Sequence, residues 1–296
     1  MRDLLYIARE PDPSGVIGLL VPELGNPIFP ALAQAMEHFA AEAGYATILC
    51  NTAGSALREA EYVHMLLERR VDGMIFVSSE LTDLRSDHRH YVRLREEGAR
   101  FVFVNGSGES LDVTSVGVDE RVAGKLATEH LLQLGHTRIG FAAGDRSSLP
   151  TRDKAEGRSQ ALVAAGIEPD GLVAYASFSV EGGRSALRKL LAAPGGPPTG
   201  VVCSSDLMAI GVLMEAVEQG LVVPRDLSVV GFDGTEAASW TQPGLTTIEQ
   251  PIADIATTAV LALKSLINEP ERPLPDFVFR PKLRVRASTA QPKETA

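Results

Sequence analysis

The chain of 296 residues is poor in the residue types that mark several protein classes. It holds only two cysteines, Cys50 and Cys203, each at the end of an apolar segment. We expect buried free thiols rather than a disulfide framework, with a single bridge as the less favoured alternative. The six histidines show no metal-ligand spacing, and no glycine-rich phosphate loop follows the first apolar segment. We therefore expect neither a metal nor a cofactor.

Long hydrophobic runs and an excess of basic charge are also missing. No apolar run approaches the length of a membrane span, and residues 1–15 contain no apolar core or cleavage site of a secretory signal. With 28 basic and 38 acidic residues, the formal net charge is -10. An acidic chain repels phosphates, so we expect no broad nucleic-acid-binding surface on this chain. These absences predict a cytoplasmic protein that does not enter the membrane.

The sequence does contain a long alternation of apolar strands and amphipathic helices. Its length favours two lobes over one, and the alternation predicts parallel sheets covered by helices on both faces. The pattern runs from residue 16 to 135 and then restarts, which predicts two doubly wound lobes. A late amphipathic helix over 252–267 either extends the second lobe or crosses back to the first, and periodicity favours neither.

The stretch from residue 201 to 234 is the most informative part of the chain. An apolar strand, VVC, is followed by three polar residues that can cap a helix, and LSVVGF forms a second buried strand. The intervening helix is predicted to bury one face, formed by Leu207, Ile210, Met214 and Val217. Ser205 and Asp233 then follow neighbouring parallel strands at their carboxyl ends, where open α/β sheets bind ligands.

Several segments together resemble the lactose-repressor/galactose-repressor (LacI/GalR) family of bacterial transcription regulators. They include IGLLVPELGNPIFPAL, VDGMIFVSS, SSDLMAIGVLMEAVEQGLVVPRDLSVVGFDG and LTTIEQP. The resemblance implies an α/β fold of two doubly wound parallel-sheet lobes joined by three crossovers, similar to type I periplasmic binding proteins. It implies a remnant or linker over 1–15, a first lobe over 16–137 plus 246–268, a second lobe over 138–245 plus 269–289, and a mobile tail over 290–296.

The resemblance also implies a function without catalysis. It predicts an effector-sensing domain that binds a small polar ligand, a sugar or a polyol, between the lobes of a homodimer. Operator DNA would be contacted only through a helix-turn-helix head, and residues 1–15 do not resemble one. The alternative is a solute-binding protein of a transport system. An enzyme is least favoured, because the expected cleft offers one carboxylate and no paired acid and base.

Nine residues are expected to bind the ligand from their positions in the family pattern. They are Asn26, Phe29, Asn105, Arg152, Lys154, Phe178, Ser205, Asp233 and Gln250. Asp233 has the strongest claim, because a carboxylate at a strand end accepts two sugar hydroxyls in charge-assisted hydrogen bonds. A plain Asp-Gly turn is its structural alternative. The others have structural alternatives too, as turn or helix-start residues, core aromatics or caps.

Three positions depart from the pattern of the family's sugar binders. Lys154 stands where the family usually has arginine, and lysine lacks the bidentate fork, although Arg152 could compensate. Ser205 stands where many sugar binders have asparagine, and Asn105 begins Asn-Gly where relatives often have Asp-Arg. These departures weaken a simple pentose or hexose assignment and leave a modified sugar, a nucleoside or another polyol open.

Overall fold

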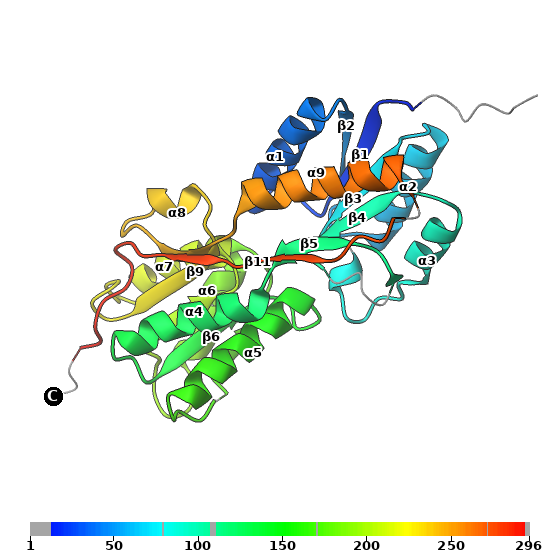
Figure 1. Ribbon diagram of the computed structural model, residues 1–296. Coiled ribbons are helices and arrows are strands. Elements are labelled where there is room, and N and C mark those ends of the chain that lie inside the picture. Colours follow the sequence, from blue (N-terminus) through cyan, green and yellow to red (C-terminus); the bar gives the residue numbers. More distant parts are fainter. Residues whose placement is uncertain (1–12, 79, 107–110, 170, 271, 294–296) are drawn as a thin grey trace, which may run out of the picture.

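The computed structural model describes residues 13–78, 80–106, 111–169, 171–270 and 272–293. Within these residues, two six-stranded sheets form two lobes (Figure 1). The first sheet has the order β11-β5-β4-β3-β1-β2. Its strands are β1 (Val16–Val21), β2 (Ala46–Asn51), β3 (Gly73–Val77), β4 (Phe101–Val104), β5 (Ser115–Val118) and β11 (Phe277–Phe279).

The second sheet has the order β12-β10-β9-β8-β6-β7. Its strands are β6 (Ile139–Ala143), β7 (Val173–Tyr175), β8 (Gly200–Cys203), β9 (Ser228–Asp233), β10 (Thr246–Glu249) and β12 (Lys282–Arg284). The strands pair in parallel except at the edge, where β10 and β12 run antiparallel. The predicted α/β class with two doubly wound lobes is confirmed.

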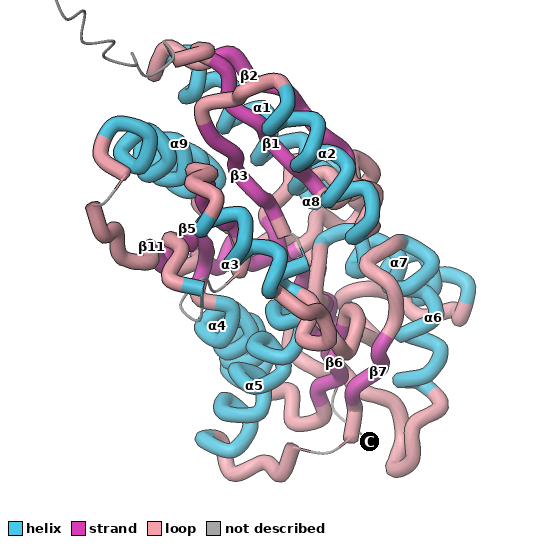
Figure 2. Tube along the Cα trace, turned by 90° about the vertical axis from the view of Figure 1, so that its right-hand side faces the viewer, coloured by secondary structure: helices cyan, strands magenta, loops and turns pink. Residues whose placement is uncertain are grey.

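Helices cover both faces of each sheet, as the strand patterns require. In the first lobe, one face packs against α1 (Ile28–Glu42) and α9 (Ile252–Asn268), and the other against α2 (Ala56–Glu68) and α3 (Arg89–Glu96) (Figure 2). In the second lobe, α4 (Glu120–Gln133) and α5 (Leu149–Ala164) cover one face, and α6 (Val180–Leu191) and α7 (Asp206–Glu218) cover the other. A short helix, α8 (Ala237–Trp240), contacts α7.

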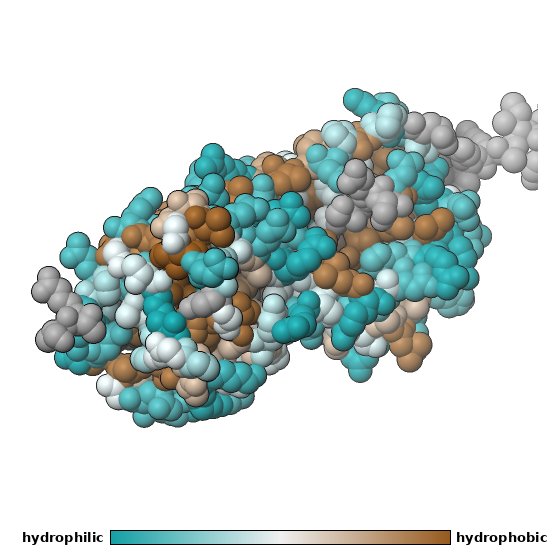
Figure 3. Space-filling model, turned by 90° about the horizontal axis from the view of Figure 1, so that it is seen from below, coloured by the Kyte–Doolittle hydropathy of each residue, from teal (hydrophilic) through white to brown (hydrophobic). Residues whose placement is uncertain are grey.

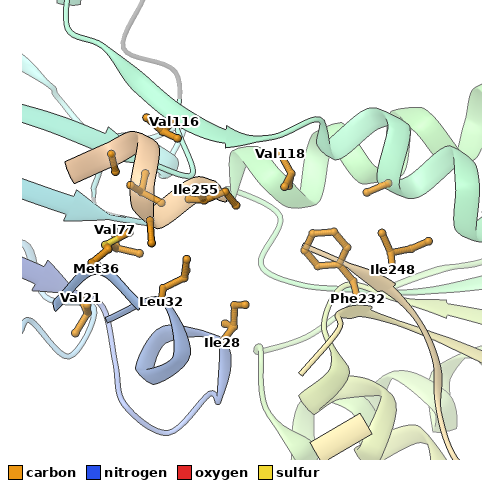
Figure 4. Packing of buried hydrophobic residues seen from close by; sticks show 14 of the residues in the cluster. Val21, Ile28, Leu32, Met36, Val77, Val116, Val118, Phe232, Ile248 and Ile255 are labelled. Carbon is orange, nitrogen blue, oxygen red and sulfur yellow. The ribbon is translucent and has the colours of Figure 1, made fainter. Parts of the chain in front are cut away.

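One apolar cluster runs through both lobes and joins them. It includes Ile28 and Leu32 of α1, Ile255 of α9, and Phe232 and Ile248 of the second sheet (Figure 4). The faces of the two lobes nearest the connections therefore share one core, which fixes the base of any cleft between the lobes. Figure 3 shows the elongated, two-lobed outline from below.

The chain crosses between the lobes three times, after β5, after β10 and after β11. The late helix α9 packs against α1 and against β3 to β5 of the first sheet, so it crosses back as the family resemblance implies. The structure corrects the predicted boundaries at two strands. Residues 246–249 belong to the second sheet, and residues 277–279 pair with β5 in the first. Strands as short as these show no residue pattern that identifies the sheet that they join.

Both ends of the described chain form hydrogen bonds with the lobes. The backbone N–H groups of Ser14 and Gly15 donate to the Asp72 carboxylate at 2.7 and 2.8 Å. Residues 1–12 and 294–296, parts of the predicted linker and tail, lie outside the described residues. The remainder of the predicted mobile tail packs on the second lobe instead, where the Ala290 carbonyl is 2.9 Å from His136 Nε2. The ring of His136 therefore has a structural role.

The exposed face of α7 contradicts the predicted burial pattern. The face predicted to be buried consisted of Leu207, Ile210, Met214 and Val217. In the structure Met214 and Val217 are 46% and 74% exposed, whereas Met208, Val212 and Ala216 are buried. Because α7 is apolar on all sides, apolar spacing alone did not identify the face that contacts the sheet.

The structure also describes the two cysteines and the features that the sequence lacks. Cys50 and Cys203 are both buried and free. Burial raises the pKa of both thiols. In the described part of the chain, no helix is long and apolar enough to cross a membrane, and no cluster of three or more potential metal ligands is found.

Candidate functional site

A cavity of about 320 Å³ lies between the lobes and is lined by residues from both. Eight of the nine predicted residues line it: Asn26, Phe29, Asn105, Lys154, Phe178, Ser205, Asp233 and Gln250. Arg152 does not line the cavity. Its half-exposed guanidinium bonds the neighbouring Asp153 at 2.8 Å. Residues two apart on a helix point to different sides, so Arg152 cannot share the orientation of Lys154.

Asp233 ends strand β9 at the base of the cavity. Its side chain is buried, with the residue only 4% exposed, and its backbone φ of 124° is unusual for any residue except glycine. One carboxylate oxygen, Oδ1, accepts a hydrogen bond from Gln250 Nε2 at 2.9 Å. The other, Oδ2, has no hydrogen-bond partner among the described residues. Asp233 therefore offers a free, buried acceptor to the cavity.

A second buried carboxylate, Asp206, holds the turn that carries Asp233. It lies at the start of α7 and accepts hydrogen bonds from the N–H and hydroxyl of Thr235, at 2.7 and 2.9 Å, and from the hydroxyl of Thr247. Burial raises the pKa of Asp206 to about 6. Burial also raises the pKa of Asp233 well above its ordinary value, and the charge of Asp206 raises it further. The sequence indicated that Asp206 might cap a helix but not that it supports the site.

The raised pKa values of Asp206 and Asp233 predict how the stability of the ligand-free protein depends on pH. The folded state keeps protons on them above pH 4, where unfolded aspartates have lost theirs, so their contribution to stability falls as the pH rises from about 4 toward 7. We expect Asp233→Asn to raise the free energy of unfolding at pH 7 by roughly 0.5–2 kcal/mol, the usual size of one stabilising substitution at a functional site.

Urea unfolding at pH 5 and pH 7 measures this effect. The difference in stability between the two pH values is expected to be smaller in Asp233→Asn than in the wild type. Glu37→Gln, at an exposed side chain of α1 that has no ion pair within the described residues, is the control and should change neither value. A variant that is less stable than the wild type at pH 7 would contradict the assigned electrostatic cost.

A buried ion pair lies beside Asp233. Lys154 of α5 places its ammonium 2.6 Å from a carboxylate oxygen of Glu120, the first residue of α4, and 3.7 Å from the centre of the Phe232 ring. Burial raises the pKa of Glu120, and Lys154 opposes that rise. Helices α4 and α5 pack closely at Gly124, where a Cβ would lie 2.1 Å from the Lys154 carbonyl oxygen. This contact fixes Lys154 in place.

Other buried polar groups face the same cavity. Asn105 directly follows β4, has a backbone φ of 61° and donates to Ser78 Oγ at 3.3 Å. Its Oδ1 and the Oε1 of Gln250 have no hydrogen-bond partner within the described ranges. Leaving a buried acceptor unsatisfied is costly, so these oxygens favour a ligand rich in hydrogen-bond donors. Ser205 instead uses its hydroxyl to cap α7, accepting from Met208 N at 3.2 Å.

The three remaining predicted residues of the cavity are Asn26, Phe29 and Phe178. Asn26 is buried and accepts weakly from the Ile28 N–H at 3.5 Å, so it also shapes the start of α1. Phe178 lies against the backbone at Gly144, where a Cβ would come within 2.0 Å of the ring. Together with Phe29 and Phe232, Phe178 gives the cavity apolar surfaces beside its polar groups.

Sequence analysis missed the loops at the mouth of the cleft. From the first lobe, Asp83 and Leu84 meet Ser147 and Ser148 of the second; the Leu84 N–H donates to the Ser147 carbonyl at 2.8 Å, and Asp83 and Ser148 form an isolated β-bridge. Glu23, Thr82, Arg85 and Asp145 also line the cavity. Loops have no periodicity, so neither pattern nor spacing identified these residues. The lobes are thus in contact across the mouth.

The fold and the cleft define a two-lobed sensor similar to periplasmic binding proteins. Residues 128–289 match the family model described as a periplasmic binding protein-like domain. Among solved structures, a transcriptional regulator CelR–cellobiose complex matches with a TM-score of 0.84 and 27% identity, over 93% of this chain and 85% of that chain. A LacI family transcriptional regulator from Enterococcus faecium with bound ribose matches with a TM-score of 0.82 and 30% identity, over 94% and 100%.

Curated relatives identify the family. An uncharacterized HTH-type transcriptional regulator in the aml 5' region of Streptomyces limosus is 45% identical, over 94% of this chain and 80% of its own length. The HTH-type transcriptional regulator MalR of Streptomyces coelicolor is 40% identical, over 93% and 81%. The chain belongs to the LacI/GalR family of transcriptional regulators, and its described residues form the family's effector-binding core.

Proposed function

We propose that this chain senses a saccharide in the cleft between its lobes and transmits the resulting closure to operator-binding heads. The observation that carries the proposal is the set of buried acceptors without partners in the described chain: Asp233 Oδ2, Gln250 Oε1 and Asn105 Oδ1. Sugar hydroxyls are donors of the kind these oxygens lack, and a hydroxyl bound to a carboxylate is among the stronger hydrogen bonds. The structural relatives bound to cellobiose and to ribose support this ligand class.

The mechanism is a population shift between open and closed lobes. Asn105 comes from the first lobe, Asp233 from the second, and Gln250 from a crossover between them. A ligand that contacts all three in the closed state, and fewer in the open state, favours closure by that difference in affinity. We assign no catalytic role to the cleft, and the HTH-type relatives favour a cytoplasmic regulator over a transport protein.

A thermal-shift screen tests the proposal. Its panel contains ribose, glucose, cellobiose, sugar phosphates and nucleosides. A ligand at about 100 times its dissociation constant stabilises the folded state by roughly 2.7 kcal/mol, which raises the midpoint by several degrees. We expect saccharides to raise it. Shifts with nucleosides alone, or with no compound, would overturn the saccharide assignment.

We further propose that the chain forms a homodimer through an apolar patch on the second lobe. The patch consists of the exposed side chains Met214, Val217, Val222 and Trp240, on α7, the loop after it and α8. Trp240 is 72% exposed and is the only tryptophan in the sequence. A contiguous exposed apolar patch is typical of a protein interface, and most interfaces between identical chains are symmetric.

Trp240→Glu is expected to produce a monomer. A charge at the centre of an apolar interface is left buried and unpaired, which weakens association strongly. Sedimentation velocity at tens of micromolar measures the change, with a dimer expected for the wild type. Val163→Glu, at a 60% exposed position on α5, is the matched control and should remain dimeric. A Trp240→Glu protein that sediments as a dimer would place the interface elsewhere.

A further inference from the structure

The cleft is lined by more acidic than basic side chains. Its lining includes five carboxylates and two basic side chains: Glu23, Asp83, Glu120, Asp145, Asp233, Arg85 and Lys154. Both basic groups are already paired. Lys154 bonds Glu120 at 2.6 Å, and Arg85 donates twice to Asp83, at 3.1 and 2.9 Å.

The other three carboxylates have no ion pair with a basic side chain among the described residues. Asp233 lies at the base of the cavity, and its Oδ2 is free of hydrogen bonds within the same residues. Glu23 is half-buried just after β1, and burial raises its pKa. Asp145, after β6, accepts hydrogen bonds from the N–H and hydroxyl of Ser147 at 2.8 and 2.7 Å. Those bonds lower the pKa of Asp145 and keep it ionised at neutral pH.

The position of these groups determines what they can select. Asp233 contacts the interior of the cavity, whereas Asp145 belongs to the loop that meets the first lobe across the mouth, and Glu23 lines the same cavity from the first lobe. A phosphate or carboxylate entering from the mouth would lose its hydration among like charges and find no unpaired cation. Like-charge repulsion grows as water is excluded. A hydroxyl or an ammonium group, by contrast, donates to these oxygens.

We propose that the cleft selects its effector by charge: it admits neutral and amine-bearing saccharides and excludes phosphorylated or carboxylated ones, with Glu23 of the first lobe and Asp145 of the second setting this selection. The inference rests on the proposed saccharide site and adds the charge class of its ligand. It gives Glu23 and Asp145 a role in specificity that is separate from the hydroxyl-accepting role of Asp233.

Calorimetry with matched neutral and anionic forms of the same sugar tests the selection. The pairs are ribose and ribose 5-phosphate, glucose and glucose 6-phosphate, and cellobiose and cellobionic acid, with glucosamine as the amine-bearing probe. In each pair that binds, the neutral member is expected to bind at least about tenfold more tightly, a difference of about 1.4 kcal/mol. Glucosamine should bind at least as tightly as glucose, and its affinity should fall with added salt.

The double variant Glu23→Gln/Asp145→Asn tests whether these two carboxylates cause the preference for neutral sugars. We expect the ratio of neutral to anionic affinity to fall toward one. The control, Glu61→Gln/Asp112→Asn, changes two exposed carboxylates outside the cleft and should leave the ratio unchanged. An anionic member that binds as tightly as its neutral partner, or an unchanged ratio in the cleft variant, would overturn the charge selection and leave the saccharide site standing. Failure of every sugar to bind would overturn both proposals.

Discussion

Asp233→Ala is expected to abolish saccharide binding and to leave the fold intact. The Asp233 carboxylate is the buried acceptor at the end of β9, with Oδ2 free in the cavity and Oδ1 held by Gln250. Hydrogen bonds to a charged group contribute roughly 1.5–3 kcal/mol each. Oδ2 has two lone pairs, so it can accept two hydroxyls, and losing both hydrogen bonds weakens binding by roughly 3 kcal/mol or more, which is over a hundredfold in the dissociation constant. Calorimetry with the best saccharide from the thermal-shift screen measures the loss.

The control for this variant must separate loss of a ligand contact from loss of structure. Circular dichroism and the urea midpoint of Asp233→Ala should show a folded protein, because removing a buried carboxylate with a raised pKa relieves an electrostatic cost. Asp112→Ala, at a side chain on the first lobe that is 96% exposed, should bind as the wild type does. Unchanged affinity in Asp233→Ala would refute its assignment as the main ligand acceptor.

Lys154→Met is expected to cost about 3–5 kcal/mol of stability, because it leaves the Glu120 carboxylate buried without its partner. The pKa of Glu120 is already raised by burial, and loss of Lys154 raises it further. The folded variant then holds a proton that the unfolded chain has lost above about pH 4.5. Its stability therefore falls as the pH rises, and the loss should be larger at pH 8 than at pH 5. Urea unfolding at the two pH values measures both effects.

A double-mutant cycle shows whether the pair acts as a unit. Lys154→Met/Glu120→Gln removes both charges, so most of the loss in Lys154→Met should be recovered. The exposed pair of Arg272 and Glu269 offers a comparison, since the coupling between exposed ions is usually below about 1 kcal/mol. Additive losses at Lys154 and Glu120 would show that the buried pair contributes no more than its two members separately.

Several of the predicted site residues follow strands at the carboxyl edge of a parallel sheet. The alternating pattern was enough to place Ser205 and Asp233 at such an edge of the second sheet, whereas Asn105, which follows β4 in the first sheet, was predicted from the family pattern. Arg152 was assigned by its closeness in sequence to Lys154 and not by helical spacing, and it does not line the cavity. Glu23, Arg85 and Asp145 lie in loops, whose course depends on tertiary contacts that no local pattern encodes.

For the fold, too, long regular elements were predicted correctly, whereas short strands and the orientation of one helix were not. Alternating strands and helices predicted two doubly wound lobes, because long elements bury regular apolar faces. The sheets to which β10 and β11 belong were mispredicted, since strands of three or four residues carry too little pattern to identify the sheet that they join. The buried face of α7 was mispredicted because apolar residues occur around the whole helix. Its exposed apolar face is part of the surface that we propose for a dimer.

The central claim, that a saccharide closes the cleft, is tested most directly by the distance between the lobes. Spin labels on Glu96→Cys of α3 and Gln160→Cys of α5 report it by double electron–electron resonance. Both positions are exposed, and the native Cys50 and Cys203 are buried, so labelling is selective. We predict that the best-binding saccharide narrows the distance distribution to the closed value and that Asp233→Ala removes this response. A saccharide that binds with no change in the distribution would contradict the account.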